Sequence, residues 1–464
     1  MRYISTRGQA PILNFEEALL TGLARDGGLY VPESWPQMSR DEITALAGLP
    51  YEEVAFRVMK PFIGDTFSDT EFRALITKAY ASFRHIARVP LVQTGANDFI
   101  LELHHGPTLA FKDVAMQLIG QMFAAVLKRR RARVTIVGAT SGDTGSAAIE
   151  AFRGLDCVDV FILYPHGRVS EVQRRQMTTV PDSNIHTLAV EGDFDDCQAR
   201  LKDMFNDMEF RDAIQLSGVN SINWGRVLAQ VVYYFTAAVA LGAPARKISF
   251  TVPTGNFGDI FAGYVAKRMG LPIDRLVIAT NQNDILHRTL ASGNHHKNGV
   301  TPSISPSMDI QVSSNFERLL FDIYDREGAA VSQLMTDLKD KGGFALSQGA
   351  LEKMRHEFDS ARCSETETSD TIRKTARETG QVVCPHTAVA IKVAADMRGD
   401  PGVPMISLAT AHAAKFPAAV KAACGIQPAL PAHMGDLFDR TERITRVPNA
   451  LNAIQDIIRK GIPT

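Results

Sequence analysis

Residues 102–117, ELHHGPTLAFKDVAMQ, contain a single lysine with few charged neighbours. Lys112 follows Phe111, precedes a segment that we predict to be helical, and has one acidic neighbour, Asp113, before mostly apolar residues. Burial and the positive end of a helix both lower the pKa of lysine from about 10.4. A neutral amine is a nucleophile that forms Schiff bases with carbonyl compounds. The alternative is a structural lysine with a buried stem, whose charge is paired with Asp113 or Asp143.

A second candidate is the loop PTGNFGD at 253–259, which follows a predicted strand. Gly255 and Gly258 permit tight turns, and the free N–H groups at the start of the next helix form an anion site that suits a phosphate. The loop has neither the G-K-[ST] of a Walker loop nor G-x-G-x-x-G, which disfavours nucleoside triphosphates and dinucleotides. A plain turn capped by Asn256 is the alternative.

A third candidate is the loop SGDTG at 141–145, which also follows a predicted strand. Several N–H groups at such a turn form a nest that binds a carboxylate or a phosphate. The alternative is a tight turn in which Asp143 caps the next helix. A neutral lysine together with two anion-binding loops favours a cofactor that carries both a carbonyl and a phosphate, and pyridoxal phosphate has both groups.

The elements that must position these loops alternate between strands and helices. β-Branched strands run through small-residue loops into helices at 132–154, 246–270 and 404–425. This order predicts a parallel sheet covered on both faces, with ligands bound outside the carboxyl ends of its strands. Residues 1–92 carry apolar residues at helical spacing instead. The predicted helix caps are Ser39, Ser68 and Asp113.

The composition of the chain limits the classes of binding partner and the cellular compartment that we expect. The 464 residues predict two or three domains, and 50 basic against 51 acidic residues leave a net charge of -1, which favours neither nucleic acid nor a membrane surface. The basic run at 128–133 ends a predicted helix, where cations complement the dipole. Five cysteines without a C-x-x-C argue against disulfides and a metal cluster. With no predicted signal or transit peptide, we expect a cytoplasmic protein.

Seven segments resemble one known family. They are STRG, LARDGGLYVPESWP, HGPTLAFKD, GATSGDTGSAA, NSINWGR, VPTGNFGD and LATAHAAKFP, in this order along the chain. The chain is similar in them to the threonine synthases, which belong to the pyridoxal-phosphate fold type II superfamily with the tryptophan synthase β subunit. The resemblance implies an α/β fold with two interleaved parallel-sheet subdomains, and a mostly helical N-terminal domain at 1–92. The catalytic domain would be 93–464, with its smaller subdomain at roughly 113–215 and the rest in the larger one.

The resemblance also implies roles for individual residues. Lys112 would carry the cofactor as a Schiff base, and Thr410 would lie beside its pyridine nitrogen. The cofactor phosphate would be held by Gly255, Asn256, Phe257, Gly258 and Asp259. The candidates for binding substrate are Ser141, Asp143 and Thr144 for the carboxylate, Arg226 and Lys415 for the phosphate, and His105. A structural role for His105 and surface ion pairs for Arg226 and Lys415 are the alternatives, and no metal site is expected.

The reaction implied is the last step of threonine biosynthesis. O-phospho-L-homoserine and water would give L-threonine and phosphate, by γ-elimination of phosphate and β-addition of water, in a carbon–oxygen lyase. One alternative is a phospholyase that turns the same substrate into 2-oxobutyrate. Another is a non-catalytic ligand sensor on the same fold, against which the intact Lys112 and phosphate loop argue. A monomer and a homodimer are both compatible with the sequence.

Overall fold

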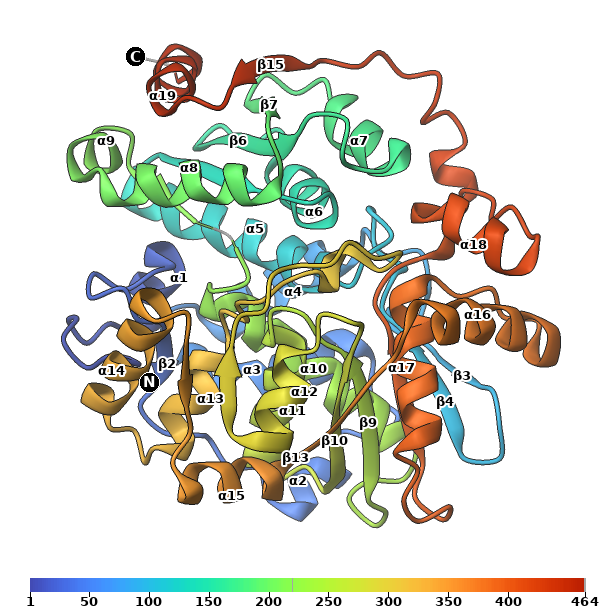
Figure 1. The fold of residues 1–464 in the computed structure, drawn as a ribbon. Coiled ribbons are helices and arrows are strands. Elements are labelled where there is room, and N and C mark those ends of the chain that lie inside the picture. Colours follow the sequence, from blue (N-terminus) through green and yellow to red (C-terminus); the bar gives the residue numbers. More distant parts are fainter. Residues whose placement is uncertain (219, 463–464) are drawn as a thin grey trace.

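A computed structural model describes residues 1–218 and 220–462, and its core consists of two separate sheets (Figure 1). The larger sheet has six strands in the order β13-β10-β9-β14-β4-β3, and the smaller has five in the order β15-β7-β6-β5-β8. All neighbouring strands in both sheets are parallel except β3 and β4. The larger-sheet strands are β3 Leu91–Gln93, β4 Asp98–Glu102, β9 Ile248–Pro253, β10 Ile273–Thr280, β13 Phe358–Arg362 and β14 Met405–Ala409. The smaller-sheet strands are β5 Val134–Ala139, β6 Val158–Pro165, β7 Ile185–Glu191, β8 Leu216–Ser217 and β15 Thr445–Pro448.

Both sheets have helices packed on them, and two short antiparallel pairs lie apart from them. These pairs are β1 Tyr3–Ser5 with β2 Tyr30–Pro32 and β11 Asn294–His296 with β12 Gly343–Ala345. The first ten helices are α1 Phe15–Thr21, α2 Arg40–Thr44, α3 Tyr51–Ile63, α4 Asp69–Tyr80, α5 Lys112–Arg130, α6 Asp143–Phe152, α7 Glu171–Thr178, α8 Phe194–Asn206, α9 Met208–Ala213 and α10 Trp224–Ala240. The others are α11 Gly258–Arg268, α12 Ile285–Ser292, α13 Phe316–Ile323, α14 Gly328–Asp340, α15 Gln348–Glu357, α16 Glu365–Thr379, α17 Pro385–Asp396, α18 Pro417–Cys424 and α19 Leu451–Gly461, with short 3-10 turns η1 Pro306–Met308, η2 Ala413–Lys415 and η3 Ala432–Met434.

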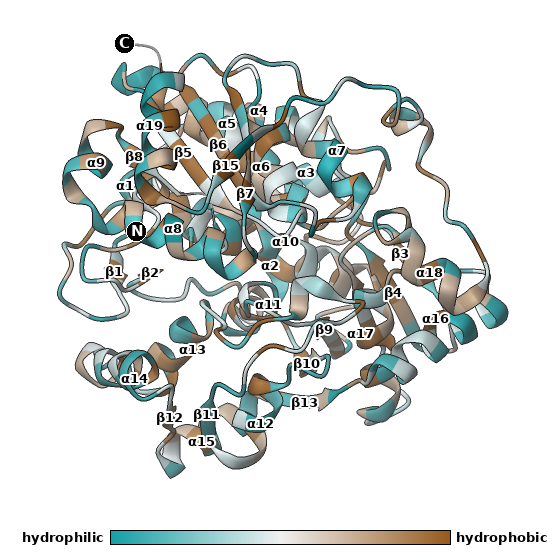
Figure 2. Ribbon diagram, turned by 45° about the horizontal axis from the view of Figure 1, so that its top comes forward, coloured by the Kyte–Doolittle hydropathy of each residue, from teal (hydrophilic) through white to brown (hydrophobic). Residues whose placement is uncertain are grey.

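The central strands are buried along their whole length. Every residue of β6, VDVFILYP, and of β9, ISFTVP, is buried. Continuous burial follows from helices on both faces of a parallel sheet, and Figure 2 shows hydrophobic residues concentrated in these strands. The three strand, loop and helix units predicted from the sequence are present as β5–α6, β9–α11 and β14–α18.

Helices are the main elements of the first 92 residues, as predicted: this segment holds α1 to α4 together with β1, β2 and the start of β3. The Ser39 and Ser68 caps are confirmed, since each hydroxyl accepts a bond from the N–H three residues later, that of Glu42 or Glu71, at 3.2 Å. Asp113 is not a cap. Residue Phe111 precedes the first turn of α5, and the Asp113 carboxylate accepts bonds from the N–H and hydroxyl of Thr108 instead, at 2.8 and 2.7 Å.

The end of the chain returns to the smaller sheet. β15 pairs with β7, and α19 packs beside α8 of the same part (Figure 1). The sequence predicts that everything after about residue 215 belongs to the larger subdomain. Instead, β15 joins the smaller sheet, and α19 packs against α8 beside it. Of the helices in the described ranges, none is long and apolar enough to cross a membrane.

Candidate active site

The loop between β9 and α11 leaves the start of α11 open. Phe257 precedes the helix with a left-handed φ of 64°, and among the described residues no side chain caps the helix, so Asn256 is not a cap. A larger residue at Gly255 would force the loop to shift, since a Cβ there would lie 2.8 Å from the Ser307 carbonyl oxygen. Uncapped N–H groups at a helix start bind anions well, and phosphate above all. The backbone geometry therefore suits the phosphate-loop prediction.

Lys112 is the first residue of α5 and is held beside the carboxyl end of β14. The Phe111 N–H donates to the Thr410 carbonyl at 2.8 Å, which fixes the chain just before the lysine. The Lys112 side chain is 12% exposed, and its Nζ lies 3.6 Å from Asp143 Oδ2. Burial lowers the pKa of Lys112 to about 8; the Asp143 carboxylate opposes this shift, while Arg226 and Lys415 add to it. The amine is thus neutral in part at physiological pH.

One pocket joins the lysine to the open helix start. Its wall includes these predicted residues: Lys112, Thr144, Arg226, Gly255, Asn256, Phe257, Gly258, Asp259 and Thr410. Among the residues that the structure describes, the wall leaves out Ser141, Asp143, Lys415 and His105. It adds residues that the sequence prediction missed: Phe111, Ser221, Gln230, Pro253, Thr254, Ser307, Met308 and His386. The pocket thus places an amine and an anion site in one cavity.

Arg226 is a buried cation in this wall without an acidic partner in the described part of the chain. It lies in the first turn of α10, is 3% exposed, and its Nε and Nη1 make no hydrogen bond to described residues. Burial lowers the pKa of Arg226 to about 10. A desolvated, unpaired guanidinium is costly unless an anion binds it, and its fork suits phosphate and carboxylate.

Asp143 and Lys415 form a buried pair behind the pocket. Asp143 Oδ1 accepts from Lys415 Nζ and from Gln173 Nε2, both at 2.8 Å. Burial of Asp143 favours its neutral form, but Lys415 and Lys112 outweigh this and hold its pKa well below the usual range. Asp143 is therefore a counter-ion and not the cap of α6, which has Gly142 at its N-cap.

The Asp259 and His105 side chains are both engaged by neighbouring residues. Asp259 Oδ1 accepts from the Tyr233 and Tyr234 hydroxyls, the latter at 3.0 Å, and burial raises the pKa of Asp259 to about 6. The ring of His105 pairs with Glu102 at 2.7 Å. Asp259 therefore reaches the pocket with its side chain bound to tyrosines, and the phosphate site depends on the backbone around it.

Comparison with known proteins agrees with this geometry. Three family models match: "Threonine synthase N terminus" over residues 2–80, "Pyridoxal-phosphate dependent enzyme" over 84–337 and "Threonine synthase, C-terminal" over 387–458. Threonine synthase from Pseudomonas aeruginosa is 54% identical over 459 residues, 99% of this chain and 98% of its own length. The chain belongs to the threonine synthase family.

Solved structures of threonine synthases share the whole fold. The crystal structure of PLP-bound threonine synthase from Brucella melitensis has a TM-score of 0.96 and 58% identity over 99% of both chains. The Escherichia coli threonine synthase structure has a TM-score of 0.85 and 32% identity over 100% of both chains. The predicted family, fold type II architecture, pyridoxal phosphate cofactor and threonine synthase function are thereby confirmed, and the sensor alternative is set aside.

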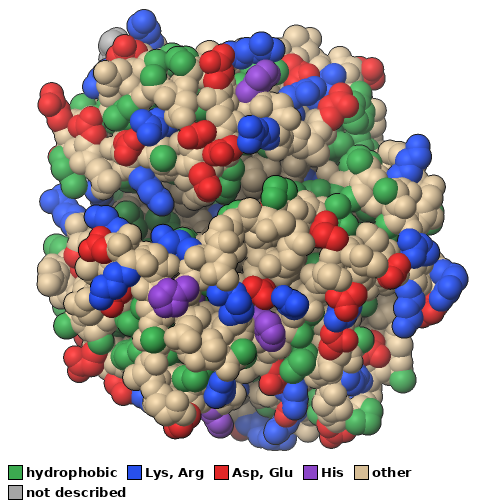
Figure 3. Space-filling model, viewed as in Figure 1, with side chains coloured by type: hydrophobic (Ala, Val, Ile, Leu, Met, Phe, Trp, Pro, Cys, Tyr) green, Lys and Arg blue, Asp and Glu red, His purple; other side chains and the backbone are tan. Residues whose placement is uncertain are grey.

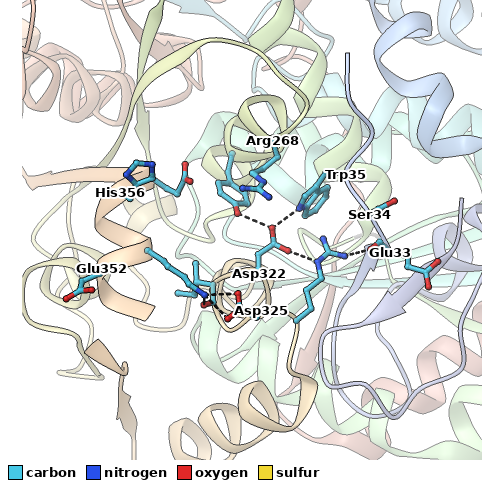
Figure 4. A pocket seen from close by; sticks show the side chains of 13 residues that line it. Glu33, Ser34, Trp35, Arg268, Asp322, Asp325, Glu352 and His356 are labelled. Atoms are coloured by element: carbon cyan, nitrogen blue, oxygen red, sulfur yellow. Dashed lines mark hydrogen bonds and ion pairs between the residues drawn. The ribbon is translucent and has the colours of Figure 1, made fainter. Parts of the chain in front are cut away.

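A larger hollow of the threonine synthase fold lies elsewhere (Figure 4). Its volume is about 770 Å³, and it shares no lining residue with the lysine pocket. At its centre Asp322 accepts from Trp35 Nε1 at 2.7 Å, Tyr264 OH at 3.0 Å and Arg326 Nε at 2.9 Å. Asp322 and Arg326 pair with each other here, and the hollow holds neither Lys112 nor the 255–259 loop, so size alone does not make it the active site. The face in Figure 3 is also hollowed between the smaller-sheet part above and the larger-sheet part below.

Proposed function

We propose that this threonine synthase converts O-phospho-L-homoserine and water to L-threonine and inorganic phosphate, with Lys112 as both cofactor anchor and base. The observation that carries this proposal is the pocket itself, in which a buried amine with a pKa near 8 and an uncapped helix start lie together. These groups fit the aldehyde and the phosphate of pyridoxal phosphate.

The cofactor would be held at three points. N–H groups of 255–259 would bind its phosphate, the Lys112 amine would bind its aldehyde, and the Thr410 hydroxyl would face its pyridine nitrogen. When bound, pyridoxal phosphate withdraws electrons from the α carbon of an amino acid and makes its proton removable. A neutral hydroxyl at the ring nitrogen leaves that withdrawal milder than a carboxylate would.

Lys112 would move the protons. When its amine is free, the Lys112 Nζ would take the α proton of the substrate. A base whose pKa lies near the working pH is efficient in both directions of such a transfer. A β proton must also leave as the γ-phosphate departs, and a proton must reach the γ carbon to form the methyl group. Water then adds at the β carbon, and the α carbon regains a proton. Lys112 and the departing phosphate are the candidates for this second acid–base role.

Substrate contacts are assigned from charge. Arg226, buried and unpaired among described residues, would bind the substrate phosphate. Ser141 and Thr144, at the start of α6, would bind the carboxylate through hydroxyls and N–H groups, because the Asp143 carboxylate is occupied by cations. Lys415 is likewise occupied and would not reach the phosphate, and the contact assigned to His105 stays a prediction.

The compartment, the oligomeric state and the domain boundaries are proposed from the sequence. We infer a cytoplasmic protein that binds a small-molecule substrate, as a monomer or homodimer. Its N-terminal domain would be 1–92 and its catalytic domain 93–464. The cysteines Cys157, Cys197, Cys363, Cys384 and Cys424 are free, which suits a reducing compartment.

Replacing the anchor tests the proposal. We expect Lys112→Ala to abolish threonine formation, because it removes both the amine that holds the aldehyde and the base. Borohydride should trap the cofactor on the peptide containing Lys112 in the parent enzyme and on no peptide of the variant, as read by peptide mass mapping. Trapping elsewhere in the parent enzyme would refute the assignment.

A further inference from the structure

Two lysines share one buried carboxylate beside the pocket. Lys415 Nζ lies 2.8 Å from Asp143 Oδ1, whereas Lys112 Nζ lies 3.6 Å from Asp143 Oδ2. Lys415 is 0% exposed and also donates to the Thr108 carbonyl at 2.8 Å. The closer and better bonded partner of Asp143 is therefore Lys415, although Lys112 is the lysine that lines the pocket.

This arrangement has a consequence for the charge on Lys112. A buried carboxylate stabilises an ammonium ion beside it, and would keep a lone lysine protonated. Here the Asp143 charge is already neutralised by Lys415, so a proton on Lys112 adds an excess positive charge in a site of low dielectric constant. Nearby positive charge from Arg226 acts in the same direction.

We propose that Lys415 is a positioning residue that neutralises Asp143, so that Lys112 loses its proton and can bind the cofactor near physiological pH. This inference rests on the proposed role of Lys112. It also gives Lys415 a role different from the substrate contact predicted from the sequence.

The other charged groups near Lys112 do not substitute for this pair. Titratable and charged groups reach it from α6, α10, α11, α17 and η2, namely Asp143, Arg226, Asp259, His386 and Lys415. Burial lowers the pKa of His386 to about 4, so its ring is neutral at physiological pH. Asp259 is held by two tyrosine hydroxyls. Asp143 thus remains the counter-ion on which the charge of Lys112 depends, and Lys415 controls it.

The test follows cofactor uptake by the full chain after its cofactor has been removed. Pyridoxal phosphate is added at a series of pH values, and the rate at which the visible absorbance of the bound form appears is recorded. In the parent protein this rate should rise with pH to a midpoint near the Lys112 pKa of about 8. Lys415→Met should move the midpoint up by about one pH unit, which is about a tenfold slower uptake at pH 7, with the plateau at high pH retained.

Three further variants complete the test: one should shift the midpoint in the opposite direction, one should not shift it, and one combines two substitutions. Asp143→Asn should move the midpoint down, Lys415→Arg should leave it in place, and the double variant Asp143→Asn/Lys415→Met should cancel most of the upward shift. A Lys415→Met protein that is slower at every pH with an unmoved midpoint would show a merely structural role and overturn the inference. If that variant does not fold, an unmoved midpoint in Asp143→Asn overturns it instead.

The outcome also separates this inference from the proposed function. If Lys112→Ala takes up pyridoxal phosphate with the same absorbance and the same pH profile, the role of Lys112 itself is wrong. If uptake requires Lys112 but its profile does not respond to Lys415 or Asp143, only the positioning role fails.

Discussion

At the scale of single residues, the site is defined by charges that lack their usual partners. Lys112 is a buried amine that shares its carboxylate with a better placed lysine, and Arg226 is buried without an acid among the described residues. Both conditions cost free energy unless a ligand compensates them, and ligands that supply an aldehyde or an anion do so. Such residues are therefore stronger site candidates than Asp322 and Arg326, which pair with each other in the larger hollow.

Arg226 provides a prediction with two separate readouts. We expect Arg226→Gln to raise KM for O-phospho-L-homoserine about 10- to 100-fold, since a charged hydrogen bond contributes about 1.5–3 kcal/mol. Its Tm should not fall, because removing an unpaired buried cation relieves desolvation. Steady-state kinetics and thermal unfolding measure the two effects.

Arg129→Gln is the matched control for this change, because Arg129 lies at the surface, outside the pocket wall, and pairs with Glu16. It should leave KM unchanged. If Arg226→Gln instead weakens pyridoxal phosphate binding and leaves KM for the substrate unaltered, Arg226 belongs to the cofactor phosphate and the assignment is wrong.

Side-chain partners were the part of the site that sequence did not reveal. The pattern FKDV predicted a capping role for Asp113, yet its carboxylate bonds to Thr108. Lys415 and Thr108 contact one another across 307 positions of the chain. Local spacing carries no information on such a contact. The sequence offered the Lys112–Asp143 pair only as an alternative, and it did not predict that Lys415 pairs with Asp143.

At the scale of elements, periodicity predicted most of what positions the chemistry. The strands before the three loops and the helices after them are present, as are the caps at Ser39 and Ser68. β15 was missed because its four residues are mostly exposed and pair with β7, about 250 residues earlier. Gln230 was also missed, although the sequence could have predicted it. It lies four residues after Arg226, one turn along α10, and therefore on the same face of the helix.

The β9–α11 loop predicts a sharp effect of adding one methyl group. Gly255→Ala would place Cβ 2.8 Å from the Ser307 carbonyl oxygen, so the loop must shift. We expect pyridoxal phosphate affinity to fall at least tenfold and stability to fall by about 1–3 kcal/mol, as for other overpacked sites. Cofactor titration and denaturant unfolding test both.

Gly349 is the control for this substitution, because a Cβ there meets nothing within 4 Å and the residue lies in helix α15. Gly349→Ala should leave cofactor affinity unchanged and stabilise the protein slightly, by up to about 1 kcal/mol. Equal cofactor affinity in Gly255→Ala and the parent enzyme would show that the loop does not hold the phosphate.

At the scale of the whole molecule, the pocket is assembled from both sheets. Thr144 lies in the first turn of α6, which follows β5 of the smaller sheet, and 255–259 and Thr410 follow strands β9 and β14 of the larger one. Carboxyl ends of parallel strands are where ligands bind in such folds. The repeating strand and helix order predicted this architecture, but which segments share a sheet depends on long-range pairing that the order does not specify.

The most direct test of the account is the set of products formed from O-phospho-L-homoserine by the purified protein with pyridoxal phosphate. We predict L-threonine and inorganic phosphate in a ratio of one to one, resolved by amino-acid analysis and a phosphate assay, and no product with Lys112→Ala. Phosphate released with 2-oxobutyrate and ammonia but without threonine, or undiminished turnover in Lys112→Ala, would contradict it.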